Sequence, residues 1–356
     1  MKSQQYLLSV LVTIASCHFF CGRAKAEIVE FGNDCTIEFL SAENAAIRLQ
    51  TPDLFTKATA GLERQIRLQS EKPVSEMELL AFASEQAVAW NENEIEVCRT
   101  QILSLAAAIE KLKLHVKFPS KIEFIKTTGN EEGGAAYCRG NAVVFSAKVL
   151  KTPPEGLRSL IAHELFHVFS RTNPDTRDKL FQIIGFKRCG VLMLPEKFAA
   201  RRLTNPDAPI LEHFMQIEQD DESVNIVPVT YLSVENFEPG NMFKFLKFDL
   251  IAIESPQAGE QVAAKINDNG RPIFIAPSNN TFHKQIGRNT NYVIHPEEIM
   301  ADNFSMLVTE KSEIPDPWIT EKIAAILREK QSTDKTSRDR TTDFQSADPA
   351  TQDSTD

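Results

Sequence analysis

The chain has 356 residues, which is enough for one large domain or two modest domains with a buried core. Hydrophobic residues make up 42% of it and charged residues 25%, a composition that predicts a largely globular protein. The formal net charge of −10 argues against a protein that binds nucleic acid, and against one drawn to anionic membrane surfaces by charge.

The first 26 residues have the layout of a secretory signal peptide. Lys2 precedes an apolar run over residues 6–14, and Ala24-Lys25-Ala26 supplies a cleavage site of the small-x-small type. The apolar run is too short to cross a bilayer, and no other segment approaches about 20 continuous apolar residues. We therefore expect an exported protein, periplasmic or secreted, with no integral membrane segment.

A lipid anchor is the alternative interpretation of the same segment. Residues 14–17, Ile-Ala-Ser-Cys, resemble a bacterial lipobox, in which Cys17 would be lipidated. The segment stays apolar beyond Cys17, at Phe19 and Phe20, and this favours simple secretion over a lipoprotein.

Four cysteines remain in the mature chain: Cys35, Cys98, Cys138 and Cys189. An even number in an oxidising compartment predicts two disulfides. Their order along the chain favours the pairs Cys35–Cys98 and Cys138–Cys189. A zinc site made of all four cysteines is the rival interpretation, but the chain has no CxxC pair.

The first half of the mature chain changes from helical to strand-like patterning. Residues 27–113 are expected to form a helical N-terminal region, because apolar residues recur at three- and four-residue steps over 92–114. Strands are then predicted over 121–128 and 135–150, separated by the turn "GNEEGG".

Residues 114–330 are predicted to form a second domain that contains a β-rich insertion. Strand patterns fill about 205–280, and helices return at 295–311 and near 315–330. Residues 331–356 have Phe344 as their only large hydrophobe, so we expect a disordered acidic tail.

The stretch "IAHELFHVFS" carries the strongest functional signal. His163, Glu164 and His167 have the spacing HExxH, and residues four apart share one face of a helix. Two imidazoles so placed can bind one zinc ion, and Glu164 can take a proton from a water molecule that zinc activates. This is the chemistry of metal-assisted amide hydrolysis.

An accidental match to three fixed positions is the competing explanation. The flanking residues 160–169 are otherwise apolar nearly all round, which is typical of a buried helix. Two histidines and a glutamate inside such a helix are costly unless they are paired or coordinated. The flanks therefore favour a metal site.

A catalytic zinc needs a third protein ligand and one open position. Ser170 and Asn173 stand where the extended HExxHxxGxxH form would have glycine and histidine, so a distant acid must serve. Within "HPEEIMADNF", Glu298 and Asp302 lie four apart behind Pro296, which suits the first turn of a helix. We expect Glu298 to bind zinc.

Asp302 is then expected to accept a hydrogen bond from the free imidazole nitrogen of His163, which would fix that ring. The simplest alternative is that Glu297 and Glu298 only complement the dipole at the helix N-terminus.

His163-Glu164-x-x-His167 followed by Glu298-x-x-x-Asp302 resembles the gluzincin (thermolysin-like) class of zinc metallopeptidases. The resemblance covers two helices, and it implies zinc bound by the two histidines and Glu298, with Glu164 as general base and Asp302 orienting the first histidine. It also implies an α+β, zincin-like catalytic domain with a small mixed sheet. His167 and Glu298 are 131 residues apart, far more than in thermolysin-like enzymes, so the β-rich stretch would be an insertion.

That long separation leaves other acids open as the third ligand, namely Glu297, Glu212 and Glu218. The resemblance further implies an edge strand beside the zinc where substrate backbone can pair, and "NAVVFS", residues 141–146, suits that position. It implies a tyrosine or histidine that stabilises the oxyanion, for which Tyr292 and His295 are candidates.

The sequence thus predicts an exported zinc metallopeptidase that acts on peptide or protein substrates. The main alternative is a non-catalytic cell-envelope protein that keeps a zincin fold for binding or scaffolding. A third hypothesis is an unrelated secreted binding module in which the HExxH spacing is accidental.

Overall fold

A computed structural model describes residues 27–32, 34–256 and 261–329. The expected signal peptide, Cys17 and the C-terminal tail lie outside the described residues. Within them the chain forms an α+β protein with twelve α-helices and three sheets, so the predicted α+β class is confirmed.

The strands are β1 (Glu27–Glu30), β2 (Thr36–Phe39), β3 (Lys121–Thr127), β4 (Tyr137–Arg139), β5 (Ala142–Ser146), β6 (Phe186–Arg188), β7 (Leu192–Met193), β8 (His213–Gln219), β9 (Glu222–Leu232), β10 (Leu246–Ala252), β11 (Val262–Ala263) and β12 (Phe274–Ile275). The α-helices are α1 (Ala42–Leu49), α2 (Leu54–Ala58), α3 (Gly61–Leu68), α4 (Glu76–Glu85), α5 (Glu92–Lys111), α6 (Pro154–Thr172), α7 (Pro174–Ile183), α8 (Glu196–Ala199), α9 (Met242–Phe245), α10 (Asn280–Ile286), α11 (Pro296–Val308) and α12 (Pro317–Arg328).

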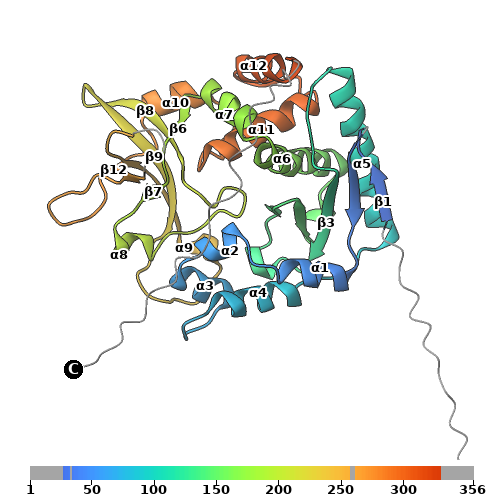
Figure 1. The fold of residues 1–356 in the computed structure, drawn as a ribbon, viewed down its shortest axis with the longest axis horizontal. Helices are drawn as coiled ribbons and strands as arrows, with labels where there is room; N and C mark the ends of the chain where they lie inside the picture. The colour runs from blue at the N-terminus through green and yellow to red at the C-terminus, as the bar shows by residue number, and fades with distance from the viewer. Residues whose placement is uncertain (1–26, 33, 257–260, 330–356) are drawn as a thin grey trace, which may run out of the picture.

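Two five-stranded sheets lie on either side of the contacting helices α6 and α11 (Figure 1). The mixed sheet has the order β1-β2-β3-β5-β4, with β2, β3 and β5 parallel and the two outer strands antiparallel to their neighbours. The second sheet, β12-β10-β9-β8-β6, is antiparallel throughout. A short parallel pair, β7 and β11, completes the described sheets.

Two prolines mark the limits of helix α6, which begins at Pro154 and ends two residues before Pro174. Pro154 occupies its first turn, where a missing N–H removes no helical hydrogen bond. Asn173 follows the helix and precedes Pro174, a position that disfavours helical backbone, and its amide donates to Phe169 O at 2.8 Å. These signals limit the helix to the nineteen residues that carry the HExxH spacing.

The main apolar core joins both sheets through α6 and α11. Phe166 of α6 and Phe304 of α11 are buried with ring centroids 5.5 Å apart, while Phe145 of β5 and Met215 of β8 belong to the same cluster. Because the middle of α6 is packed on several sides, Glu164, His167 and Ser170 are buried in a largely dry environment.

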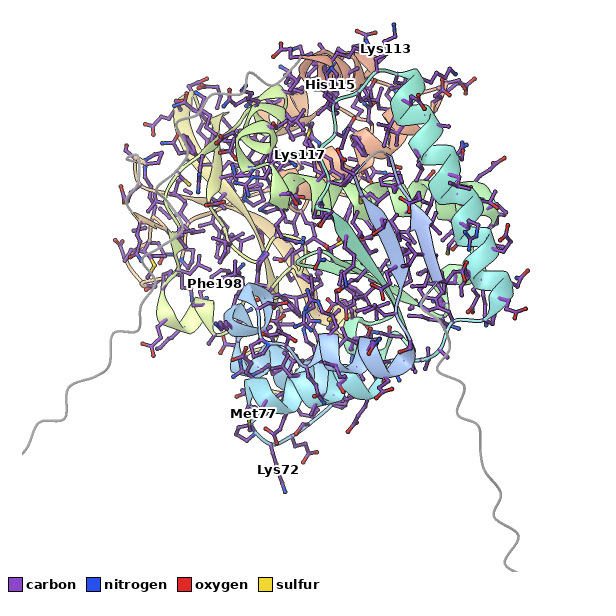
Figure 2. All side chains as sticks on the ribbon, turned by 45° about the vertical axis from the view of Figure 1, so that its right-hand side comes forward. Lys72, Met77, Lys113, His115, Lys117 and Phe198 are labelled. Atoms are coloured by element: carbon purple, nitrogen blue, oxygen red, sulfur yellow. The ribbon has the colours of Figure 1, made fainter. Side chains whose placement is uncertain are left out.

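The N-terminal region is helical from Ala42 onward, but it begins with two strands that the sequence pattern did not predict. Strand β2 pairs in parallel with β3, with Thr36 opposite Lys121 and Phe39 opposite Phe124. Residues 27–113 and the following segment therefore share one sheet. Lys113, His115 and Lys117 mark the connection from α5 toward β3 (Figure 2).

The prediction that residues 141–146 form an edge strand is wrong. Residues 142–146 form β5, which lies between β3 and β4, and the strand at this edge of the sheet is β4. Gly140 and Asn141 form a two-residue turn between β4 and β5, and Gly140 has a φ of 64°. Such turns favour glycine, which carries no Cβ to oppose a positive φ.

The expected disulfides are not formed, and all four cysteines of the described chain are free and buried. Cys35, Cys98 and Cys138 belong to the main core, whereas Cys189 packs in a second cluster with residues of the antiparallel sheet and β7. Each thiol packs as a small apolar group. Burial raises the pKa of Cys35 and of Cys98 to about 12. Among the described helices, none is long and apolar enough to span a membrane.

We expect four free thiols in protein that lacks residues 1–26. Native protein should react slowly with a thiol reagent, because the thiols are buried and their pKa values are raised. Protein denatured without reductant should titrate as four thiols. A titration near zero would show that disulfides form after all.

Candidate metal centre

Two histidines on α6 and one glutamate on α11 form a group that could hold a metal ion. One ligand atom from each of His163, His167 and Glu298 lies within 4.8 Å of the others. Glu298 Oε2 is 3.1 Å from His163 Nε2 and 3.6 Å from His167 Nε2. Two ligands of a tetrahedral zinc at the usual distances lie about 3.3 Å apart, so this spacing suits such an ion.

An orphaned nitrogen supports the same assignment. His167 is fully buried, and its Nε2 has no hydrogen-bond partner among the described residues. A buried polar atom without a partner costs about 1–3 kcal/mol, whereas a metal ligand bond would satisfy it. The residues present therefore fit a metal ion.

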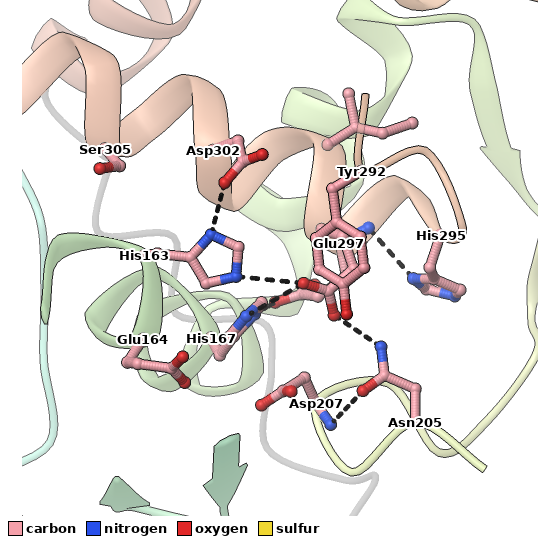
Figure 3. A network of polar contacts seen from close by, with 12 residues as sticks. His163, Glu164, His167, Asn205, Asp207, Tyr292, His295, Glu297, Asp302 and Ser305 are labelled. Carbon is pink, nitrogen blue, oxygen red and sulfur yellow. Dashed lines mark hydrogen bonds and ion pairs between the residues drawn. The ribbon is translucent and has the colours of Figure 1, made fainter. Parts of the chain in front are cut away.

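A carboxylate on α11 faces the other nitrogen of each histidine ring. His163 Nδ1 is 2.8 Å from Asp302 Oδ1, and His167 Nδ1 is 3.0 Å from Glu297 Oε1. Ser170 Oγ donates to Glu297. Figure 3 shows the contact between His163 and Asp302. Contacts of this kind fix the orientation of an imidazole, so that its Nε2 can face a metal ion.

Glu298 is held from its far side by a residue that the sequence pattern did not indicate. Asn205 Nδ2 donates to Glu298 Oε1 at 2.6 Å, which leaves Oε2 facing the histidines. Burial would raise the pKa of Glu298, but His167, His163 and this amide outweigh it and lower the pKa to about 2. The carboxylate is therefore ionised and ready to bind a cation.

The remaining candidate ligands lie elsewhere. Glu297 contacts His167 on the Nδ1 side, away from Nε2. Glu212 is engaged with Arg177 and Arg188, and Glu218 is an exposed residue of β8. Of the four acids considered, only Glu298 joins the group that could hold a metal.

Glu164 lies beside the group and faces a cavity of about 570 Å³, which His163 and Glu298 also line. Burial raises the pKa of Glu164 to about 7, and the Cys138 thiol donates to Glu164 Oε2 at 3.3 Å. A buried carboxylate with such a pKa can exchange protons near neutral pH.

The two candidates for oxyanion stabilisation differ in position. Tyr292 lines the cavity, and its ring stacks on His163 with centroids 6.4 Å apart. His295 is buried at the start of α11, where its Nδ1 accepts a hydrogen bond from Glu297 N at 3.0 Å. Burial lowers the pKa of His295 to about 3, so its ring is neutral. His295 caps the helix and is not among the residues that line the cavity.

Asp207 is a further acid of the cavity. Its Oδ1 accepts from Cys138 N at 2.7 Å, and ligand atoms of Asp207, Cys138 and Glu164 lie within 4.8 Å of one another. Asp207 and Asn205 belong to the turn "TNPD", in which Asp207 N donates to Asn205 Oδ1. An Asn-Pro pair favours a turn, but the pair does not show that this turn lies beside the group of possible ligands.

We expect the histidine pair to bind one equivalent of Zn²⁺. His163→Ala or His167→Ala leaves two ligand atoms, so binding should be lost in a calorimetric titration with Zn²⁺. The control is His213→Ala, which removes a buried histidine bonded to Asp178 instead. Equal binding by all four proteins would refute the site.

Asn205→Ala should weaken Zn²⁺ binding by roughly 10–100-fold, the usual effect of losing a partner of a ligand. Asn279→Ala is the matched control, because its amide contacts Glu218 O at 3.0 Å and not the metal group. Dissociation constants from competition with a chelator provide the measurement, and an unchanged constant for Asn205→Ala would exclude its role.

The chain was compared with family models, with curated proteins and with solved structures, and no match was found in any of the three.

Proposed function

We propose that the protein is an exported zinc metallopeptidase with a zincin-like catalytic domain, and that Glu164 is its general base. The observation that carries the proposal is the joint placement of His163, His167 and Glu298 around one point, with Glu164 beside them on a cavity. A site that only stores or senses a metal would not require a buried, protonatable carboxylate at its opening.

Zinc held by this group supplies Lewis acidity toward a water molecule and toward the substrate carbonyl. Glu164 takes the proton from the attacking water and returns it to the nitrogen of the departing amine, so that one C–O bond forms and the C–N bond breaks. Tyr292 lines the same cavity, and its hydroxyl can donate to the oxygen of the reacting carbonyl.

The edge of the mixed sheet supports a peptide as substrate. Ala135 and Ala136, directly before β4, line the cavity, whereas Cys138 N and Gly140 O on the same segment already bond to Asp207 and Arg171. A substrate in extended conformation would therefore pair with residues 135–136 rather than with the strand predicted from the sequence.

Three substitutions should give three different results with Zn²⁺ and a denatured casein substrate. Glu298→Ala should lose both zinc and hydrolysis, because two ligands remain. Asp302→Ala should keep the fold and lose roughly 10–100-fold in affinity or activity. Glu164→Gln should keep zinc and lose nearly all hydrolysis, since only the proton acceptor is removed.

Hydrolysis by the parent protein, compared with hydrolysis by Glu164→Gln, separates catalysis from metal binding. Parent protein that binds zinc but cleaves no peptide would support the alternative of a non-catalytic envelope protein. If Glu298→Ala binds zinc and cleaves as the parent does, the third ligand has been misassigned.

A further inference from the structure

A buried arginine in the N-terminal region contacts both segments that approach the metal group. Arg67 lies on α3, and only 1% of its side chain is exposed. Its guanidinium donates to Glu63 Oε1 at 2.8 Å, to the carboxylate of Glu132, to Glu131 O at 3.4 Å and to Thr204 O at 3.2 Å. Every one of these partners is itself buried.

Glu63, one helical turn before Arg67, binds the other polar atoms of Thr204. Glu63 Oε1 accepts from Thr204 N at 3.0 Å, and Oε2 accepts from Thr204 Oγ1 at 2.9 Å. Thr204 is thus held at its N–H, its hydroxyl and its carbonyl by two side chains of one helix. We call Arg67, Glu63, Glu132 and Thr204 the buried charge cluster.

Two residues of the buried charge cluster come shortly before two segments of the chain that line the cavity, residues 135–136 and the turn that contains Asp207. Asn205, which holds Glu298, directly follows Thr204, and Ala135 and Ala136 come three and four residues after Glu132. The same guanidinium therefore anchors the segment that fixes the third ligand and the segment that leads to the edge strand.

A cluster of this kind is a poor way to gain stability. Taking an arginine and two glutamates out of water costs several kcal/mol per ion, and apolar residues of similar volume often serve equally well. What the cluster does provide is orientation, since the two charged side chains bond to three different atoms of Thr204.

We propose that Arg67 and Glu63 are positioning residues of the metal group, which hold Asn205 against Glu298 and residues 135–136 at the cavity. The proposal rests on the metal site of the proposed function. On this proposal the site requires helix α3 of the N-terminal region, so this helix cannot be removed without weakening metal binding.

The test is the affinity for Zn²⁺ of Arg67→Met and Glu63→Gln, measured at a temperature where circular dichroism shows full folding. Both variants should bind zinc less tightly, with losses toward the lower end of the roughly 10–100-fold range seen for indirect partners of a metal. Glu63→Gln keeps the size of the side chain, so it remains informative if Arg67→Met does not fold. Arg67→Lys keeps the charge and should recover part of the affinity.

The control removes a comparable ion pair that does not contact the cavity-lining segments. Lys126, on β3, is largely buried and bonds to Glu94 at 2.7 Å. Lys126→Met should lower thermal stability and leave zinc affinity unchanged. A purely structural role for Arg67 would give the same pattern, and that result would overturn the proposal.

Two further readouts trace the effect to Asn205. In Asn205→Ala the link to Glu298 is absent, so adding Glu63→Gln should change zinc affinity little, and additive effects would contradict the proposed route. Amide hydrogen exchange should show faster exchange at Thr204, Asn205 and Asp207 in Glu63→Gln and not in Lys126→Met. The exchange result is independent of hydrolysis and of zinc, so it separates failure of this proposal from failure of the proposed function.

Discussion

The packing of α6 on α11 is the interaction on which the rest of the site depends. It brings two imidazoles together with the carboxylates of Glu297, Glu298 and Asp302, and it leaves one ring nitrogen with no hydrogen-bond partner in the part of the chain that the structure describes. So many acids in a dry environment repel one another unless positive charge is present at their centre. Protonated histidines can supply some of that charge, and a divalent cation between the rings would supply it together with the missing bond to His167.

The two sheets can be understood as the supports that keep this helix pair in register. The mixed sheet brings β4 and Ala135 to one side of the cavity, and the segment between β6 and β8 of the antiparallel sheet brings Asn205 and Asp207 to another. Arg67 of helix α3 holds both segments, because it donates hydrogen bonds to Glu132 and to Thr204. Each side of the cavity is thus fixed by a part of the chain distant in sequence.

The sequence predicted those site residues whose relationship is local. His163 and His167, and likewise Glu298 and Asp302, are four residues apart, so helical geometry alone places each pair on one face. The structure brings both pairs together, with Asp302 on His163 as expected. Asn205 and Asp207 were missed because a turn containing proline has no periodicity that would show which way its side chains point.

The errors in the fold have similar physical causes. Strands β1 and β2 are four residues each, too short for a clear alternating pattern, and β2 finds its partner β3 more than 80 residues later. The edge strand was misassigned because the Gly-Asn turn at 140–141 divides one apolar stretch into two antiparallel strands. The cysteines were expected to pair from compartment and number, whereas their neighbours in the fold decide whether two thiols meet.

The distance in sequence between the candidate ligands has a consequence for how the proposed site would take up a metal ion. The two histidines lie on one helix, but Glu298 belongs to a helix that starts more than 120 residues after α6 ends. A partly folded chain therefore offers at most two ligands, and it would bind a metal ion weakly. Because a ligand that binds only the native state stabilises that state, metal uptake would complete folding and would make unfolding unfavourable in proportion to the free metal concentration. The proposed metal site would therefore be complete only once α11 has packed on α6.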